Sequence, residues 1–339
     1  MEAAIVEDFF KKGKLLRPEA LTLVKDGYEY KYTKDLVVGK EHFEKIQINN
    51  MVEFGEFVTT SDIVAQINKK YEKMRAIISS RLQKNFLSIN NLQKGEVFLI
   101  GVVKEIDGYR IEVEDPTGVI NVNAENHTAE LDDVIAIKGI FDGTSVTNGI
   151  MMLPDVPIRP PKKSQGKICI TTGLDFKEAP ESYIEKFFNW FAQSDAKTLI
   201  AIGKADESMG KIYERACKDK KMIFVRHEYP NKGNNLPNSN IISASNPCMI
   251  NINGIKILVV TDFSLENLRK RQFKQPKTPC EPLVVEDVPD VIVYNNQNEP
   301  QVNNYKSTTF VSTGSILSNF KPVVMDLGTR ETTQKHIDF

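Results

Sequence analysis

Cysteine and histidine are scarce in this 339-residue sequence, and long apolar runs are absent. The cysteines are widely separated and form none of the close pairs that zinc sites use, so we expect them to be reduced packing residues. No segment approaches the roughly 18 consecutive apolar residues of a membrane-spanning helix. The first residues lack the basic-then-apolar order of a signal peptide. We therefore expect a cytoplasmic protein without membrane contact. The four cysteines are Cys169, Cys217, Cys248 and Cys280.

Positive charge is not in excess either. The 44 lysines and arginines are balanced by 45 acidic residues, which gives a net charge of −1. Such a balance provides no global attraction to nucleic acid, so any contact with DNA must come from a local patch. The length allows two domains and a small additional unit, and the 41% hydrophobic content allows each domain to bury a core.

The N-terminal region, residues 1–60, begins with two short amphipathic patterns. Apolar residues recur with helical spacing from Ile5 to Phe10, Gly13 stops the pattern, and Pro18 suits the first turn of a second helix. These helices form either a docking module or a small cap on the main body. Residues 26–59 show only weak alternation and receive no assignment.

A longer helix is predicted from Ser61, its expected N-cap, to about Leu82, in a connecting region at residues 61–90. Apolar residues recur there every three or four positions, and the other face is basic. A basic helix face is usually solvated, and contact with nucleic acid or an acidic partner is the alternative. The apolar positions are Ile63, Ile67, Tyr71, Met74 and Ile78, and the basic ones are Lys69, Lys70, Lys73, Arg75 and Arg81.

Residues 91–160 carry four short strand patterns, at 96–106, 109–115, 119–125 and 133–141, separated by tight turns rich in aspartate and glycine. Short strands at this spacing predict a small Greek-key barrel, most simply an OB-fold. The strands carry few aromatic and several acidic side chains, which does not suit a groove for single-stranded DNA. We therefore expect the barrel to pack on protein.

Strand and helix patterns alternate from residue 165 to residue 339, which predicts a layered α/β domain. The fold class is thus mixed, with an all-β barrel followed by an α/β sandwich. Residues 282–288 and later runs are also read as strands, and Pro289–Asn298 ends in a polar loop of asparagines. A dense basic cluster is either an exposed helix end or a contact with DNA. Its candidate DNA contacts are Arg269, Lys270, Arg271 and Lys274.

Four stretches carry, by their order and spacing, a resemblance to a known family. They are IEVEDPTGVINV at 111–122, LPDVP at 153–157, ISASNPCMININGIKILVV at 242–260 and PLVVEDVPDVIV at 282–293. In this arrangement the chain resembles the small subunits of archaeal family D DNA polymerases, and the resemblance begins at the N-terminal helices. The B-subunits of eukaryotic replicative polymerases share the architecture. The resemblance implies that residues 165–339 form a calcineurin-like metallophosphoesterase domain.

In that family such a domain hydrolyses DNA 3′ ends with two metal ions, held by carboxylates, imidazoles and an asparagine at strand ends. The resemblance aligns Thr172 and Leu174 with the first ligand pair, and Lys204 with the bridging carboxylate, where a cation repels metal. The altered positions are Thr172, Leu174, Lys204, Glu207, Arg226, Thr261, Asn296 and Asn298, and His227 and Glu228 are retained.

The histidine inventory supports a degenerate site, because only His227 of the four histidines lies near a motif. We therefore expect no catalytic residue and no cofactor. Nearby acids leave open a single Mn²⁺ or Mg²⁺ site, and ion pairing with Lys204 and Arg226 is the alternative for them. These acids are Asp175, Asp206, Glu207, Glu228 and Asp262, and the other histidines are His42, His127 and His336.

The C-terminal residues Gln334, Ile337 and Phe339 loosely resemble a peptide that binds sliding clamps. The match is one residue short and lacks the second aromatic side chain. A frayed tail without a partner is the alternative reading.

The resemblance and the altered site together predict a non-catalytic accessory subunit of a replicative DNA polymerase. It would form a heterodimer with the large catalytic subunit, reach DNA through that complex, and lie in the archaeal cytoplasm at the nucleoid. Three alternatives stay open: an active 3′–5′ exonuclease subunit with a rearranged metal site, a eukaryotic-type B-subunit in the nucleus, and a free module that binds single-stranded DNA.

Overall fold

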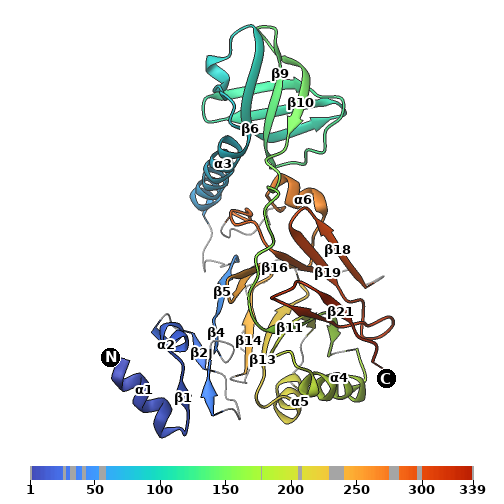
Figure 1. Cartoon of the computed structure of the whole chain (residues 1–339). Coiled ribbons are helices and arrows are strands. Elements are labelled where there is room, and N and C mark those ends of the chain that lie inside the picture. Colours follow the sequence, from blue (N-terminus) through green and yellow to red (C-terminus); the bar gives the residue numbers. More distant parts are fainter. Residues whose placement is uncertain are drawn as a thin grey trace. The chain divides into compact units, whose positions relative to one another are not determined.

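The computed structural model divides into two compact units, each assembled from separate stretches of chain (Figure 1). Unit 1 contains Met1–Met51, Arg159–Asp262 and Pro289–Phe339, and unit 2 contains Val52–Ile158 and Phe263–Val288. The described residues are 2–25, 28–30, 36–39, 43–52, 59–176, 178–204, 208–228, 240–274, 282–295 and 300–337. Among the helices of these residues, none has both the length and the apolar character required to cross a membrane.

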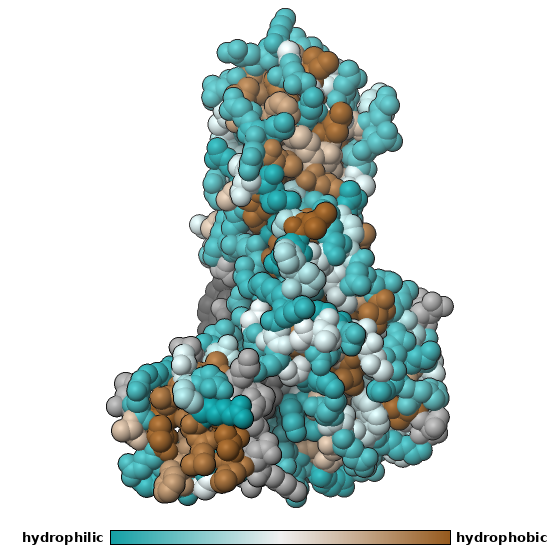
Figure 2. All heavy atoms as spheres, in the orientation of Figure 1, coloured by the Kyte–Doolittle hydropathy of each residue, from teal (hydrophilic) through white to brown (hydrophobic). Residues whose placement is uncertain are grey.

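The N-terminal part of unit 1 contains the two predicted helices, α1 (Glu2–Lys11) and α2 (Pro18–Lys25). Short strand pairs accompany them: β1 (Leu15–Leu16) lies parallel to β3 (Val37–Val38), and β2 (Glu29–Tyr30) lies antiparallel to β4 (Phe43–Glu44). Phe9, Ala20 and Val38 are buried among them. Other apolar side chains of this part are exposed, among them Phe10 at 69%. Figure 2 shows hydrophobic surface over this part of the chain, at the lower left.

The main part of unit 1 is a sandwich of two sheets. Six described strands form the first sheet in the order β14-β13-β12-β11-β20-β21, and six form the second in the order β18-β19-β17-β16-β15-β5. One apolar cluster combines side chains from both sheets, so the sheets face each other. A second cluster joins the first sheet to α4 (Glu181–Gln193) and α5 (Met209–Ala216). This layering places α-helices outside the sandwich and explains the near-continuous apolar runs of its central parallel strands.

Each sheet of the sandwich contains six of the described strands. The first sheet contains β11 (Lys167–Asp175), β12 (Thr198–Lys204), β13 (Lys221–Arg226), β14 (Ile241–Ala244), β20 (Val323–Asp326) and β21 (Thr332–Gln334). The second contains β5 (Ile46–Asn50), β15 (Cys248–Ile252), β16 (Ile255–Val260), β17 (Val291–Tyr294), β18 (Gln301–Tyr305) and β19 (Thr308–Ser312). The predicted helices and most predicted strands of this domain are present, whereas β5, β14, β18 and β21 were not predicted.

In unit 2, the long helix α3 (Thr60–Leu82) begins two residues before its predicted start, because Thr59 rather than Ser61 is the N-cap. The Thr59 hydroxyl accepts from the N–H of Asp62, and the Asp62 carboxylate accepts from the N–H of Thr59. The placement of Lys70 on the solvated basic face is also wrong. Lys70 is buried, and its Nζ donates to the carbonyl of Asp132 at 2.6 Å.

The barrel of unit 2 is closed, in the strand order β10-β8-β7-β6-β9. Its strands are β6 (Gly95–Asp107), β7 (Arg110–Asp115), β8 (Gly118–Asn123), β9 (Val134–Phe141) and β10 (Val146–Met152). The first four agree with the predicted runs, and the fifth was not predicted in detail. Asp115 orders the turn between β7 and β8, because its carboxylate accepts from the N–H groups of Thr117, Gly118 and Ile89.

The segment Phe263–Val288 leaves the sandwich between β16 and β17 and belongs, by its internal contacts, to unit 2. The predicted boundary at residue 165 assigned it to the second domain instead. It contains the short helix α6 (Leu265–Lys270). The predicted strand at 282–288 is wrong, since the described residues there form only one isolated bridge, Gln272 with Val284. Val284 packs with Met74 and Ile100 of unit 2, which explains the apolar run.

The described cysteines, Cys169, Cys217 and Cys248, are buried and free, as predicted. Burial raises the pKa of each of these thiols, which keeps them protonated and unreactive. Cys280 lies outside the described residues.

Candidate functional site

The positions aligned with metal ligands lie at the carboxyl ends of parallel strands from both sheets. Among them, Lys204 ends β12, Arg226 ends β13 and Thr261 follows β16. Asn295, which is not itself an aligned ligand position but directly precedes Asn296, follows β17. Gly203 pairs in register with Leu174 on one side and with Arg226 on the other. In α/β sheets this edge is where ligands bind and reactions occur. The structure thus brings together the described part of the predicted site.

Thr172 stands on β11 in a network of buried hydroxyl groups. Its N–H donates to Thr313 Oγ1 at 2.8 Å, and the N–H of Thr313 donates back to Thr172 Oγ1 at 2.9 Å. The Ser312 hydroxyl lies 3.4 Å from the same oxygen. Leu174 points instead into the apolar cluster beneath α4. The two residues therefore join β11 to the chain after β19 and fill the core.

Lys204 is held by two carboxylates. Its Nζ lies 2.7 Å from Glu178 Oε1 and 3.2 Å from Asp175 Oδ2. The hydrogen bonds to Glu178 and then to Asp175 raise the pKa of Lys204, so the amine stays charged. A cation thus occupies the position of a bridging carboxylate and pairs with the nearest described acids, which was the alternative reading of Asp175.

Asn246 is the most connected polar side chain at this edge, and the sequence analysis did not single it out. It is fully buried, and its Nδ2 donates to the carbonyls of Arg226 at 3.0 Å and Glu228 at 2.9 Å and to Thr261 Oγ1 at 2.6 Å. Its Oδ1 accepts from the N–H of Thr261 at 3.2 Å. Asn246 therefore ties the end of β13 to the end of β16 and engages the Thr261 hydroxyl.

His227 faces the loop after β17. Its Nε2 lies 2.6 Å from Nδ2 of Asn295, within hydrogen-bonding distance. Its N–H donates to the carbonyl of Gly203 at 2.9 Å, which fixes the backbone at the end of β13. Glu228 is exposed. Asp206, Glu207, Asn296 and Asn298 lie outside the described residues, as does His42.

The described side chains do not fit a two-metal centre. Metal ions of this type need several carboxylate or imidazole ligands converging on one point, and no group of three or more His, Cys, Asp or Glu in the described part of the chain is arranged in that way. The Thr172 and Thr261 hydroxyls are engaged in hydrogen bonds between strands, and Lys204 places a positive charge at the end of β12, paired with Asp175 and Glu178. What these side chains do is fasten the strand ends to one another.

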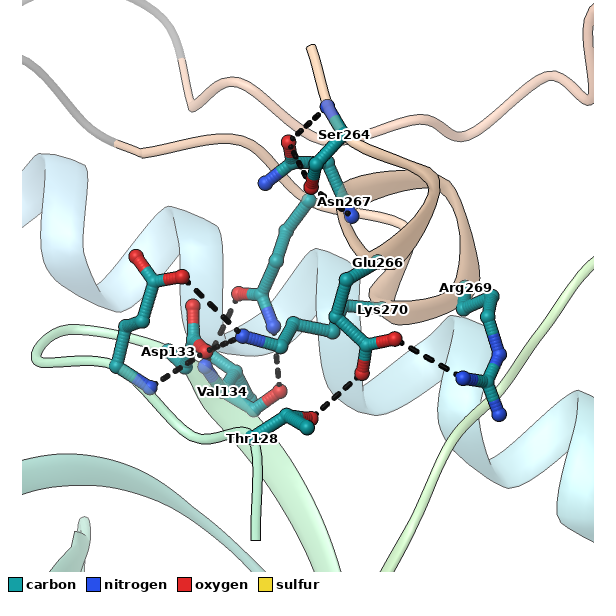
Figure 3. Close-up of polar contacts among 10 residues, drawn as sticks. Thr128, Asp133, Val134, Ser264, Glu266, Asn267, Arg269 and Lys270 are labelled. Carbon is teal, nitrogen blue, oxygen red and sulfur yellow. Dashed lines mark hydrogen bonds and ion pairs between the residues drawn. The ribbon is translucent and has the colours of Figure 1, made fainter.

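Two of the four basic residues proposed for DNA contact are buried, and Figure 3 shows one of them, Lys270, directed toward Asp133. Lys270 is 2% exposed and its Nζ lies 2.8 Å from Asp133 Oδ2. Arg271 is buried and donates to the carbonyls of Val285 at 2.8 Å and Glu286 at 2.6 Å. Lys270 joins α6 to the barrel and Arg271 joins it to a later part of the segment Phe263–Val288, so neither side chain faces solvent and their burial does not support a contact with DNA.

The remaining cations of this cluster are more exposed. Arg269 pairs with Glu266 at 3.0 Å, and Glu266 also accepts from the Thr128 hydroxyl at 2.5 Å (Figure 3). Lys274 is exposed. A DNA contact through Arg269 and Lys274 stays a prediction.

The C-terminal residues are partly held in the fold. Gln334 belongs to β21 and pairs with Val323 of β20, and Ile337 packs against the apolar cluster beneath α4. A clamp-binding peptide must be free to enter a groove on its partner, so these residues would first have to leave the sheet. Phe339 lies outside the described residues, and clamp binding stays a prediction.

Comparison with known proteins gives one sequence relative over most of the chain. The sequence is 24% identical over 379 aligned positions to the DNA polymerase II small subunit of Archaeoglobus fulgidus. The alignment covers 86% of this chain and 77% of the relative. No protein-family model matches.

Solved structures resemble about half of the chain at low similarity. A novel archaeal phosphodiesterase covers 50% of this chain and 98% of its own, with 14% identity and a TM-score of 0.36. Vps29 of Chaetomium thermophilum covers 51% of this chain and 95% of its own, with 12% identity and a TM-score of 0.32. At such TM-scores the likeness carries no conclusion about fold or function.

Proposed function

We propose that the protein is a non-catalytic accessory subunit of a replicative DNA polymerase of the family D type. The observation that carries the proposal is the similarity to a polymerase small subunit over 86% of this chain. As such a subunit it would bind a large catalytic subunit, reach DNA through that complex, and act as a scaffold. An archaeal cell, with the complex at the nucleoid, is the corresponding location.

The architecture supports this proposal. The barrel of unit 2 has five strands closed in the order β10-β8-β7-β6-β9, with β8 and β10 parallel and the other neighbours antiparallel. We assign it as an OB-fold on that order. We assign the sandwich of unit 1 as a calcineurin-like phosphoesterase domain, because its two facing sheets bring the aligned ligand positions to one edge.

The absence of catalysis is proposed from the chemistry of that edge. A two-metal hydrolase activates water between cations, which needs anionic ligands at the bridging position. Lys204 supplies a cation instead, and it is neutralised by Glu178 and Asp175 rather than by a metal-bound phosphate. Thr172 and Asn246 use their polar atoms between strands. We infer that the polar side chains at this edge connect strand ends and do not bind metal.

Two measurements on the purified protein test the proposal. The first is co-purification with the large subunit of an archaeal family D polymerase after co-expression, and we expect a stable complex. The second is Mn²⁺-dependent release of nucleotides from a DNA 3′ end, by the protein alone and in that complex, and we expect none. A nuclease activity that Asp206→Ala and Glu228→Ala abolish would establish the exonuclease alternative.

Restoring histidine to the loop after β17 should not restore hydrolysis. In Asn296→His with Asn298→His, the positions of Thr172, Lys204 and Thr261 remain unsuited to metal, so we expect no metal-dependent product. Mn²⁺ titration by calorimetry provides an independent readout on the same variant. Hydrolysis by this double variant would contradict the proposed reason for inactivity.

A further inference from the structure

A second polar cluster lies at the opposite end of the sandwich strands, away from the aligned ligand positions. Asp290 immediately precedes β17, whereas Asn295 follows it. The Asp290 carboxylate is 1% exposed and accepts from Arg159 Nη2 at 2.7 Å. It also accepts from the N–H of Lys256 at 2.9 Å, at the start of β16. These two hydrogen bonds satisfy one oxygen each.

Two further cations stand around the same carboxylate at longer range. Arg330 Nη2 lies 3.7 Å from Asp290 Oδ1, and Lys162 Nζ lies 3.9 Å from Oδ2. We call Arg159, Lys162 and Arg330, with Asp290, the Asp290 cluster. Three positive charges therefore face one negative charge. The cluster keeps an excess of two positive charges, which a purely structural ion pair does not need.

Arg330 is largely buried and its guanidinium is incompletely hydrogen-bonded. Its side chain is 12% exposed, its Nε donates to the carbonyl of Lys162 at 2.9 Å, and its Nη1 is buried without a hydrogen-bond partner. Burial lowers the pKa of Arg330, Asp290 opposes that shift, and Arg159 adds to it. Buried polar groups are normally paired, so an unpaired guanidinium nitrogen beside a second arginine indicates a site prepared for an anion.

Two of the three cations in the cluster are partly exposed to solvent. The Arg159 side chain is 24% exposed and that of Lys162 is 43% exposed. Arg159 is also anchored through its backbone, because its N–H donates to Ser307 Oγ at 2.9 Å. Lys163, the next residue of the linker, is exposed as well. Lys162 and, to a smaller extent, Arg159 can therefore be reached from solvent.

We propose that the Asp290 cluster binds the phosphodiester backbone of a nucleic acid. Guanidinium groups match phosphate oxygens in pairs, whereas the compact ammonium of Lys162 supplies a mobile charge at the entrance. Two arginines converge here, which favours phosphate over the carboxylates of an acidic peptide. The choice of DNA as the source of that phosphate rests on the proposed function, which places the subunit beside DNA. The contact is independent of base sequence, since only backbone charge is engaged.

The test uses the full chain and a fluorescein-labelled DNA duplex, with binding followed by fluorescence anisotropy at several NaCl concentrations. Lys162→Ala is expected to weaken binding roughly fivefold or more at about 0.1 M salt and to reduce the slope of log affinity against log salt by about one. Arg159→Lys keeps the charge and loses the paired geometry, so a smaller loss is expected. Lys186→Ala removes an exposed charge on α4 and serves as the matched control.

The binding data distinguish DNA from an acidic peptide and from free phosphate as the ligand of the Asp290 cluster. Equal affinities of Lys162→Ala and Lys186→Ala would overturn the proposal, and so would displacement of the duplex by poly-glutamate at the same charge concentration, which would indicate an acidic peptide. Competition by inorganic phosphate alone at equal phosphate concentration would indicate a free-phosphate site and would also overturn it. Unfolding midpoints of the variants exclude misfolding as the cause.

Co-purification with the large subunit separates this proposal from the proposed function. If DNA binding depends on Lys162 but no large subunit is retained, the cluster stands and the accessory role fails. If the complex forms and Lys162→Ala binds DNA as the wild type does, the accessory role stands and the cluster fails.

Discussion

Replacing Lys270 by methionine is expected to destabilise unit 2 by about 3 kcal/mol, because removing one member of a buried ion pair leaves the other charge unpaired. Lys270 is 2% exposed, the Asp133 side chain is 10% exposed, and their charged atoms are 2.8 Å apart. Methionine keeps most of the apolar stem, so the change removes mainly the charge. Burial lowers the pKa of Lys70 and the nearby Asp133 carboxylate opposes that shift, so Lys70 partly balances Asp133 when Lys270 is removed. We therefore expect a loss at the lower end of the usual range for a broken buried ion pair.

Two variants separate the ion pair from a general effect on α6. Arg269→Met removes a cation of the same helix that is 41% exposed and pairs with Glu266, and we expect a cost of no more than about 1 kcal/mol. The double variant Lys270→Met with Asp133→Asn removes both charges together. It should lose less than the sum of the two single variants, by about 2 kcal/mol.

Urea unfolding followed by far-ultraviolet circular dichroism measures these differences in free energy. Hydrogen exchange read by mass spectrometry locates them, and we expect Lys270→Met to lose protection in β9 and α6. The reasoning is refuted if Lys270→Met costs no more than Arg269→Met, or if the lost protection lies in the sandwich of unit 1.

Three further changes probe other contacts. Gly203→Ala should lower the soluble yield and cost more than about 3 kcal/mol in urea unfolding, because a Cβ there would lie 1.7 Å from the carbonyl oxygen of Leu174; wild-type stability would contradict the strand spacing. Asn246→Ala should lower the free energy of unfolding by about 3 kcal/mol in the same assay, since three acceptors between β13 and β16 lose their donor. A loss no larger than that of Asn91→Ala, at an exposed asparagine, would contradict the role of Asn246. Hydrogen bonds from the N–H groups of Ser145 and Thr144 hold the pKa of Asp142 far below 3.8. Because the pKa is lower in the folded state, this stabilisation is complete above pH 3.8 and is lost as the pH falls, so wild type and Asp142→Asn should differ at neutral pH and converge in acid.

The regular elements were largely predictable because their signals are local. Helices α1, α2 and α3 follow from apolar spacing, and the strands of the barrel follow from alternation between aspartate and glycine turns. The edge strand β5 was missed, since its apolar residues Ile46 and Ile48 are too few to outweigh the polar ones. Strand pairing with β15, about two hundred residues later, decides its structure.

The polar contacts were much less predictable, because their partners come from distant parts of the sequence. Lys70 and Lys270 both look like solvated helix residues until the fold brings the Asp132 carbonyl to the first and the Asp133 carboxylate to the second. The altered ligand positions could be identified one at a time by resemblance. The role of Asn246 could be identified only from the structure. This residue lies between β14 and β15, and its side chain bonds to Arg226 at the end of β13 and to Thr261 after β16.

The division of unit 2 into Val52–Ile158 and Phe263–Val288 also sets the order in which its parts become available during synthesis. The barrel strands leave the ribosome first, and α6 follows only after β11 to β16 have been made. In that interval Asp133 has no Lys270, and the backbone N–H and carbonyl of Val134 lack the Gln272 side chain that later bonds both. The nascent barrel therefore remains without its α6 contacts until the sandwich is more than half synthesised, and during that interval its uncovered surface is open to chaperones and to premature association.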